Sequence, residues 1–250
     1  MTNTLTKQSR LALVTGAGGA LGAAIARALV DEGHRVVVAD YARPGVQALA
    51  EELGSGAFPI AFDISKEHEV KAACETIRSN FGAVDVLVNN AGVLSNNKLA
   101  DTQLDEWRRI MAVNLDGAFQ LCQLLVPAMR EQRWGRIINM CSLAMKTGGL
   151  TAGTAYSTSK GALGALTFSL ARELAPHGVT ANGIAPAYVC TKMVTEQLTE
   201  AQRQQLLAGI PVGRFCEPEE VAHAVVFLSS PLSGFITGEI LDINGGLHLD

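Results

Sequence analysis

Residues 11–30, LALVTGAGGALGAAIARALV, decide the predicted fold because their hydrophobic period changes in the middle. Residues 11–14 form an unbroken apolar run, typical of a strand buried on both faces. Leu21, Ile25 and Leu29 then recur at helical spacing. Four glycines lie between the two patterns: Gly16, Gly18, Gly19 and Gly22. We expect them to supply positive φ angles, close approach of backbone to a pyrophosphate, and room for helix to pack on strand. The helix N-terminus carries unpaired N–H groups, so the stretch predicts a phosphate-binding turn.

A second β-branched run, Arg35–Asp40, favours a dinucleotide site over an ordinary glycine-rich turn. Glycine clusters also occur in turns that bind nothing. Here the run ends in a carboxylate about 20 residues beyond the glycines, where a ribose 2′-hydroxyl needs an acceptor. Asp40 would repel a 2′-phosphate, so the sequence favours NAD over NADP. Arg43 could pair with a 2′-phosphate, or it is simply a solvated loop residue.

Composition bounds the class of protein. The chain has 250 residues, 48% of them hydrophobic and 18% charged, which is enough for a large core. Strands and helices alternate without a linker, which predicts one doubly wound α/β domain over residues 1–250, with a parallel sheet of about seven strands and helices on both faces. A net charge of −4 with dispersed basic residues argues against a nucleic-acid partner.

No membrane segment, signal peptide or metal site is expected. No run approaches the ~18 apolar residues of a spanning helix, and MTNTLTKQSR has no apolar core for a signal peptide. The five cysteines include no CxxC pair, and the five histidines are far apart. These features predict reduced thiols, no metal and a cytoplasmic location.

The rest of the chain predicts further helices and strands around one crevice. Helices are expected at 44–53, 67–81, 155–175 and 218–229, one or two helices within 101–132, and strands at 57–62, 84–88, 135–141, 179–184 and 239–243. Asp63, Asn90 and Ser142 each follow a strand, and ligands of open parallel sheets bind outside the carboxyl ends of the strands. Asp63 either reaches an adenine ring or caps the helix that starts near Lys66, and both roles are compatible.

Tyr156 and Lys160 are four residues apart, so on a helix their side chains lie on one face. Alone, such a pair is usually an exposed surface pair. A free phenol has a pKa of about 10, and a neighbouring ammonium favours the phenolate. Lowering that pKa to about 7 or 8 requires about 3 to 4 kcal/mol, which Lys160 and the charge of an oxidised nicotinamide would jointly supply. Tyr156 would then act as a general acid or base, with Ser142 holding the same substrate oxygen.

Several motifs occur together: TGAGGALG at 15–22, NNAG at 89–92, VNL at 113–115, Ser142, YSTSK at 156–160 and PAYVCT at 186–191. With them the chain resembles the classical short-chain dehydrogenase/reductase family along essentially its whole length. The resemblance implies that the catalytic residues are Asn114, Ser142, Tyr156 and Lys160. It implies that a nicotinamide cofactor contacts Gly16, Gly18, Gly19, Leu21, Gly22, Asp40, Asp63, Ile64, Asn90, Ala91, Gly92, Tyr156, Lys160, Pro186, Val189 and Thr191.

The resemblance also assigns roles and exposes departures. Asn114 would hold a helix distortion and a water in a proton relay, while Pro186 and Thr191 would orient the nicotinamide carboxamide. Ala20 stands where the family has its second glycine, so Gly18 or Gly19 is expected to supply the freedom that the turn needs. Gly19 itself stands where relatives that prefer NADP often carry a basic residue, which again favours NAD.

The expected reaction interconverts a secondary alcohol and a ketone. Polar residues near the expected pocket favour a small hydroxylated or anionic substrate such as a polyol, sugar or hydroxy acid: Asn96, Asn97, Lys98, Lys146 and Thr147. An alternative is a 3-oxoacyl carrier-protein-type reductase, and an alternative of another class is an NAD-binding sensor without turnover. Residues 186–214 are expected to form a lid, with Thr195, Gln197, Leu198 and Leu206.

A homo-oligomer is expected, a tetramer by the family resemblance. The long helix that carries Tyr156 has small and apolar positions for close packing: Ala162, Ala165, Leu166 and Ser169. The apolar last strand, within 240–243, offers a second surface for a partner.

Overall fold

One parallel sheet organises the residues that the computed structural model describes, 9–191 and 199–249. Its strands are β1 (Leu11–Thr15), β2 (Arg35–Asp40), β3 (Ala57–Ala61), β4 (Val86–Asn89), β5 (Gly135–Met140), β6 (Val179–Pro186) and β7 (Ile240–Ile243). They are hydrogen-bonded in the order β3-β2-β1-β4-β5-β6-β7, and every pairing is parallel. The order reverses between β1 and β4, which is where a doubly wound sheet opens a crevice for ligands.

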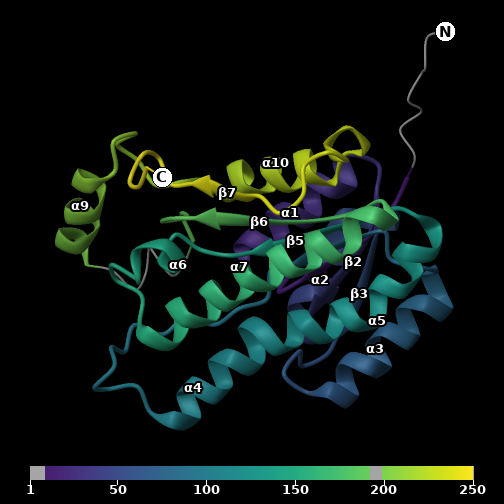
Figure 1. The fold of residues 1–250 in the computed structure, drawn as a ribbon, viewed down its shortest axis with the longest axis horizontal. Coiled ribbons are helices and arrows are strands. Elements are labelled where there is room, and N and C mark those ends of the chain that lie inside the picture. The colour runs from purple at the N-terminus through teal and green to yellow at the C-terminus, as the bar shows by residue number, and fades with distance from the viewer. Residues whose placement is uncertain (1–8, 192–198, 250) are drawn as a thin grey trace, which may run out of the picture.

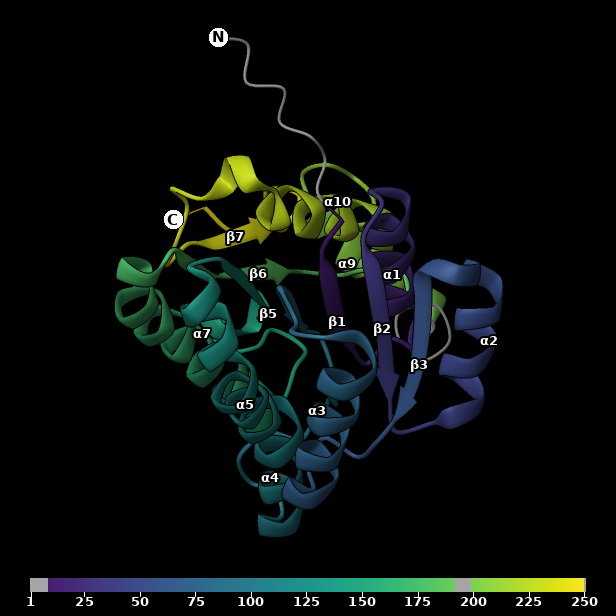
Figure 2. The same ribbon diagram turned by 90° about the vertical axis from the view of Figure 1, so that its right-hand side faces the viewer.

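Helices cover both faces of this sheet (Figures 1 and 2). One face holds α1 (Ala20–Asp31), α2 (Arg43–Leu53) and α10 (Pro218–Ser229), and the other holds α3 (Glu67–Phe81), α5 (Gly117–Gln132) and α7 (Thr154–Leu174). The remaining helices of the described residues are α4 (Leu104–Met111), α6 (Ala144–Thr147) and α9 (Glu200–Gly209), with 3-10 turns at Gly54–Gly56, Ala175–His177 and Pro231–Ser233. The predicted fold class is confirmed.

Alternation along the buried strands divides the core into two layers. In β1, Val14 packs with the layer under α1 and α10, while Leu13 packs with the layer under α3 and α5. Both side chains are fully buried. This is why the strand reads as a continuous apolar run rather than an alternating one.

The predicted helical region 101–132 is one continuous rod with a π-helical turn, Ala112–Asp116, between α4 and α5. The rod Leu104–Gln132 is also long and apolar enough, by length and composition, to cross a membrane, with 44% of its most apolar window buried in the protein. Polar and charged residues interrupt this region, so it holds no run of ~18 apolar residues and was not expected as a span. Leu121, Leu125 and Met129 of the rod pack into the core, which accounts for part of its apolar character.

Candidate functional site

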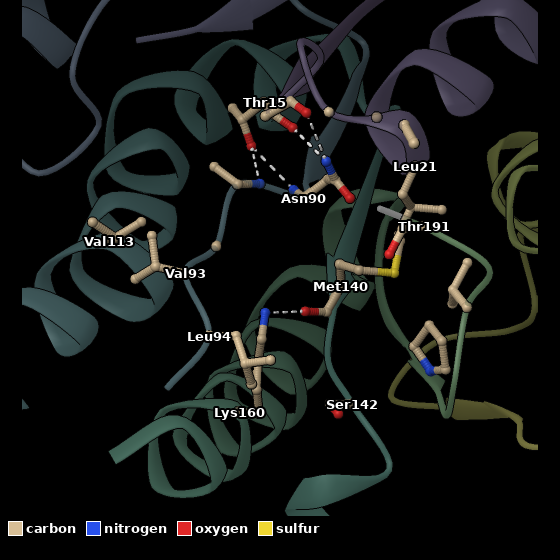
Figure 3. Close-up of a pocket in the computed structure, with 18 of the residues that line it drawn as sticks. Thr15, Leu21, Asn90, Val93, Leu94, Val113, Met140, Ser142, Lys160 and Thr191 are labelled. Atoms are coloured by element: carbon tan, nitrogen blue, oxygen red, sulfur yellow. Dashed lines mark hydrogen bonds between the residues drawn. The ribbon is translucent and has the colours of Figure 1, made fainter. Parts of the chain in front are cut away.

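The carboxyl ends of the strands border one cleft of about 1450 Å³. Every predicted cofactor contact lines it, together with Ser142, Tyr156 and Lys160, whereas Asn114 lies just behind the lining. Figure 3 shows its walls, with Thr15 and Asn90 at one end and Lys160 and Ser142 at the other. The topology therefore brings the predicted residues to one place.

The glycine turn between β1 and α1 needs glycine for two reasons. Gly16 has φ of 66°, and a Cβ on it would lie 2.8 Å from the Ala91 Cα. A Cβ on Gly22 would lie 2.2 Å from the Gly16 carbonyl oxygen. Both positions therefore exclude a side chain.

The expected positive φ at the other glycines of this turn is wrong. Gly16 is the one member of the cluster in that region of backbone space, and Gly19 is extended, with φ of −85°. Ala20 begins α1 as an ordinary helical residue, so its departure from the family pattern needs no compensation from Gly18 or Gly19. Gly19 offers no side-chain cap, which leaves first-turn N–H groups of α1 at the cleft.

Asp40 is held at the end of β2 by main-chain donors. Its Oδ2 accepts from Gly18 N at 3.1 Å, and its Oδ1 accepts from Ala42 N at 3.2 Å. A Cβ on Gly18 would approach Oδ2 to 3.1 Å, so this glycine allows close contact. Arg43, in contrast, does not line this cleft. The arrangement fits a carboxylate that accepts from a ribose hydroxyl.

Thr15 fastens the segment after β4 to the glycine turn, a role that the sequence analysis missed. Its Oγ1 accepts from Asn90 N and Ala91 N, both at 3.0 Å, and donates to Val88 O at 3.3 Å. Asn90 Nδ2 donates to Thr15 O at 2.9 Å and Gly16 O at 3.2 Å (Figure 3). The sequence feature that could have indicated this role is a hydroxyl side chain at the last position of the strand, directly before Gly16.

Asn114 lies in the π-helical turn, where the expected helix distortion occurs. The side chain is buried: its Oδ1 accepts from Val93 N at 2.8 Å, and its Nδ2 donates to Val93 O and Ser159 Oγ, both at 3.0 Å. Ser159 Oγ in turn donates to Tyr156 O at 2.7 Å. The side chain of Asn114 therefore holds together the segment at Val93 and the helix α7, which form two walls of the cleft. Its part in a water relay stays a prediction.

Tyr156 and Lys160 lie on one face of α7, beside Ser142 at the end of β5. Burial raises the pKa of the Tyr156 phenol, and a hydrogen bond with Ser142 partly offsets the rise. Burial lowers the pKa of Lys160 to about 8. Lys160 Nζ donates to Met140 O at 2.7 Å and lies 5.7 Å from the centroid of the Tyr156 ring. In the polypeptide alone desolvation therefore dominates the pKa of Tyr156, and the joint lowering of that pKa by Lys160 and an oxidised nicotinamide stays a prediction.

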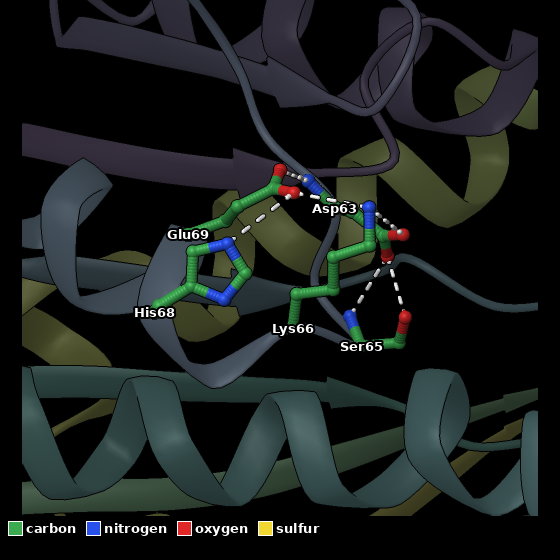
Figure 4. A network of polar contacts seen from close by, with 5 residues as sticks. All are labelled: Asp63, Ser65, Lys66, His68 and Glu69. Atoms are coloured by element: carbon green, nitrogen blue, oxygen red, sulfur yellow. Dashed lines mark hydrogen bonds and ion pairs between the residues drawn. The ribbon is translucent and has the colours of Figure 1, made fainter.

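Asp63 lines the cleft but does not cap a helix (Figure 4). The N-cap of α3 is Lys66, and Asp63 Oδ1 accepts from Ser65 N at 3.0 Å and Ser65 Oγ at 2.7 Å. Asp63 N donates to Glu69 Oε2 at 2.8 Å. The hydrogen bond from Ser65 holds the pKa of Asp63 below its usual value. The capping interpretation is wrong because the carboxylate closes a turn ahead of the helix.

Three of the five polar residues predicted at the substrate end form bonds to other parts of the protein. Lys98 Nζ donates to Gly149 O and Ala152 O, Lys146 pairs with Asp242 at 2.7 Å, and Asn97 bonds Glu106. Asn96 and Thr147 do line the cleft. The lining residues that sequence reasoning missed include Leu94, Arg109, Leu143, Leu150, Thr151 and Leu247. They come from separate segments, and no local motif marks them.

Of the predicted lid, Thr195, Gln197 and Leu198 lie outside the described residues. Leu206 lies on α9 and is not part of the cleft lining. Within 9–191 and 199–249, no three His, Cys, Asp or Glu side chains are grouped as a metal would require. All five cysteines are free thiols.

Comparison with known proteins places this site in a family. Residues 16–248 match a family model described as enoyl-(acyl carrier protein) reductase. A 3-oxoacyl-[acyl-carrier-protein] reductase FabG of Vibrio harveyi is 38% identical over 242 residues, 97% of this chain and 98% of that protein. The corresponding protein of Vibrio cholerae is 39% identical over 243 residues, 97% of this chain and 98% of its own length.

Solved structures agree in fold. A 3-ketoacyl-(acyl-carrier-protein) reductase from Brucella melitensis complexed with NADH superimposes with a TM-score of 0.91 at 33% identity, covering 98% of this chain and 100% of that one. A putative NAD(P)-dependent gluconate 5-dehydrogenase from Beutenbergia cavernae, with bound NADP at low occupancy, gives a TM-score of 0.89 at 33% identity, covering 95% and 96%. The chain belongs to the short-chain dehydrogenase/reductase family of nicotinamide-dependent oxidoreductases.

Proposed function

We propose that this protein reduces 3-oxoacyl thioesters to 3-hydroxyacyl thioesters. The observation that carries the proposal is the apolar substrate end of the cleft, where the lining beyond Ser142 and Tyr156 includes Leu94, Leu143, Leu150 and Leu247. Such a lining suits an acyl chain better than a polyol. The relatives named as 3-oxoacyl reductases support the same conclusion.

The raised pKa of Tyr156 suits this phenol to the role of proton donor. A phenol that keeps its proton at neutral pH is suited to donate it to a carbonyl oxygen as that oxygen becomes an alkoxide. Ser142 contributes a second hydroxyl beside that oxygen. Lys160, with a pKa of about 8, retains its charge at neutral pH in most molecules. A bound nicotinamide supplies the hydride, and the protein provides position and the proton.

NAD(H) is the proposed cofactor. Asp40 occupies the position for a free 2′-hydroxyl, and Arg43, the residue suited to a 2′-phosphate, lies off the cleft. The glycine turn suits a pyrophosphate, because Gly16 and Gly22 leave room where a Cβ would meet backbone atoms, and the N-terminus of α1 has no side-chain cap.

A second candidate is a polyol or sugar-acid dehydrogenase. Asn96 and Thr147 add polar groups to the cleft, and one solved relative is titled a putative gluconate 5-dehydrogenase. A non-catalytic NAD sensor is less well supported, because a binder has no need of the Ser142–Tyr156 pair at the end of its site.

A homotetramer is the proposed assembly. Phe119 on α5 is 46% exposed and Phe168 on α7 is 50% exposed, and Ala165 and Ser169 are exposed beside Phe168. Exposed aromatic side chains flanked by small residues suit close helix packing between copies. Mass photometry at micromolar concentration tests this, and a monomeric mass would contradict it.

A substrate panel tests the function. Purified protein is mixed with NADH and acetoacetyl thioester, then with NAD and gluconate or other polyols, and nicotinamide absorbance is followed. We expect turnover on the thioester, little on polyols, and none on crotonyl thioester, the matching enoyl substrate. Tyr156→Phe should abolish turnover while NADH still binds. Preference for polyols would move the assignment to the second candidate, and NADH binding without any turnover would favour the sensor.

A further inference from the structure

One cation at the substrate end of the cleft has no role in the proposed chemistry. Arg109 lies in the last turn of α4, one helical turn before Val113, and both residues line the cleft. The side chain of Arg109 is exposed. Glu106, three residues before Arg109, bonds Ser95 and Asn97, and Asn114, five residues after it, bonds Val93, so this part of the helix lies along residues 93–97. Leu94 of that segment lies beside Lys160 in Figure 3.

The acids near Arg109 are occupied by other partners. The carboxylate of Glu106, one turn earlier, accepts from Ser95 Oγ, and its Oε2 accepts from Asn97 Nδ2 at 2.9 Å. These bonds hold the pKa of Glu106 below its usual value, with a smaller contribution from the charge of Arg109. The neighbouring Arg108 pairs with Asp105 at 3.5 Å. Across the described residues, the side chain of Arg109 makes no hydrogen bond or ion pair of its own.

The charges of the cleft are divided between its two ends. Among the described lining residues the acids are Asp40, Asp63 and Glu219. Asp40 is the last residue of β2 and Asp63 follows β3, both at the cofactor end. Glu219 lies near Arg27 of α1, a lining cation that is paired with Glu52 at 2.6 Å. The substrate end has Arg109 and Lys160 and no acid in the described lining. An anionic substrate therefore meets a positive potential at this end.

The backbone at Arg109 is held in place relative to the reacting groups. It belongs to the same continuous rod as Asn114, roughly 7 Å farther along the helix axis. Asn114 bonds Ser159, and Ser159 bonds Tyr156 O, so the rod is tied to the helix that carries the phenol. The bonds from Ser95 and Asn97 to Glu106 hold the segment that contains Asn96 against α4.

We propose that Arg109, assisted by Asn96, binds an anionic group of the substrate, a carboxylate or a phosphate, that lies several bonds from the reacting carbonyl. This inference rests on the proposed function, because it concerns the same cleft. A guanidinium suits either anion, since it donates to two oxygens at once. The carboxylate would belong to a free 3-oxo acid and the phosphate to the carrier arm of a thioester.

Two matched substrate pairs separate these sources. Acetoacetate and ethyl acetoacetate share a skeleton and differ by the carboxylate charge. Acetoacetyl 4′-phosphopantetheine and acetoacetyl pantetheine share the thioester and the whole pantetheine arm and differ by the phosphate. The ratio of kcat/KM for the charged over the neutral member is measured in wild type, Arg109→Met and Arg109→Lys. Arg108→Met, which removes a neighbouring charge already paired with Asp105, is the control.

We expect Arg109→Met to lower one of the two ratios by about tenfold, through KM of the charged member, because a charge-assisted hydrogen bond is lost. Arg109→Lys should restore part of the loss, and Arg108→Met should change neither ratio. Calorimetric titration of the enzyme with NAD and the corresponding charged alcohol should show the same loss of affinity. The pair that responds identifies the source of the anion.

Unchanged ratios for both pairs would overturn the proposal, and so would a rise in KM for NADH alone, which would assign Arg109 to the cofactor. Failure of the proposed function has a different signature. Wild type would then reduce neither thioester, whereas the acetoacetate pair would still report on Arg109.

Discussion

Replacing Thr15 with valine should loosen the cofactor end of the cleft without changing side-chain shape. Thr15 is 2% exposed, and its hydroxyl accepts from Asn90 N and Ala91 N. Asn90 N also donates to Val88 O at 3.0 Å, so the variant leaves mainly Ala91 N without an acceptor. One buried, unsatisfied donor costs about 1 to 3 kcal/mol. A loss of about 2 kcal/mol, the central value, should lower the Tm of a chain of this size by roughly 4 to 8 °C.

The assay is thermal unfolding by circular dichroism, together with titration of NADH by fluorescence. Thr15→Ser is the matched control, because it keeps the hydroxyl and loses one methyl group. We expect Thr15→Val to unfold earlier than Thr15→Ser and to bind NADH more weakly, since Ala91 lines the cleft. Equal Tm and equal NADH affinity in the two variants would refute the reasoning that this hydroxyl holds the cleft together.

Three further predictions concern the same cleft. Gly22→Ala should abolish NADH binding, because its Cβ would lie 2.2 Å from the Gly16 carbonyl oxygen; titration showing wild-type affinity would contradict it. Asp40→Ala should narrow the preference for NADH over NADPH in kcat/KM, since the carboxylate that disfavours a 2′-phosphate is gone, whereas an unchanged preference would remove Asp40 from cofactor selection. The pH profile of kcat for reduction should stay flat through neutrality and fall only in alkaline solution, because the raised pKa of Tyr156 keeps the phenol protonated, and oxidation should rise with pH for the same reason. An inflection of the reductive profile below pH 7 would show that this phenol is not the acid.

Local sequence patterns were sufficient to predict the sheet and the cofactor end of the cleft. The strand-glycine-helix pattern of residues 11–30 and the acid at Asp40 each depend on short-range chemistry, so their spacing alone indicates their role. The π-helical turn at Ala112–Asp116 was expected only because the family resemblance assigns a helix distortion to Asn114. The hydrophobic period of a π-helical turn differs little from that of an α-helix, so the sequence pattern alone does not reveal it.

The substrate end was harder to predict because its walls come from segments far apart in the chain. Lys98 and Lys146 are polar residues close in sequence to the site, but they bond to main-chain carbonyls and to Asp242 instead. Arg109 lies on a helix face whose direction depends on how α4 docks, which no local pattern reveals. The pKa of Tyr156 depends on burial, and burial is a property of the packed fold.

The continuous helix from α4 to α5 connects the cleft to the protein surface. Asn114 lies in its π-helical turn, and Phe119, five residues later, is exposed. A second copy packed against Phe119 would contact the same helix whose Asn114 bonds Val93 and Ser159 at the cleft. By thermodynamic reciprocity, any tightening of assembly on loading with NADH must be matched by tighter NADH affinity in the assembled form.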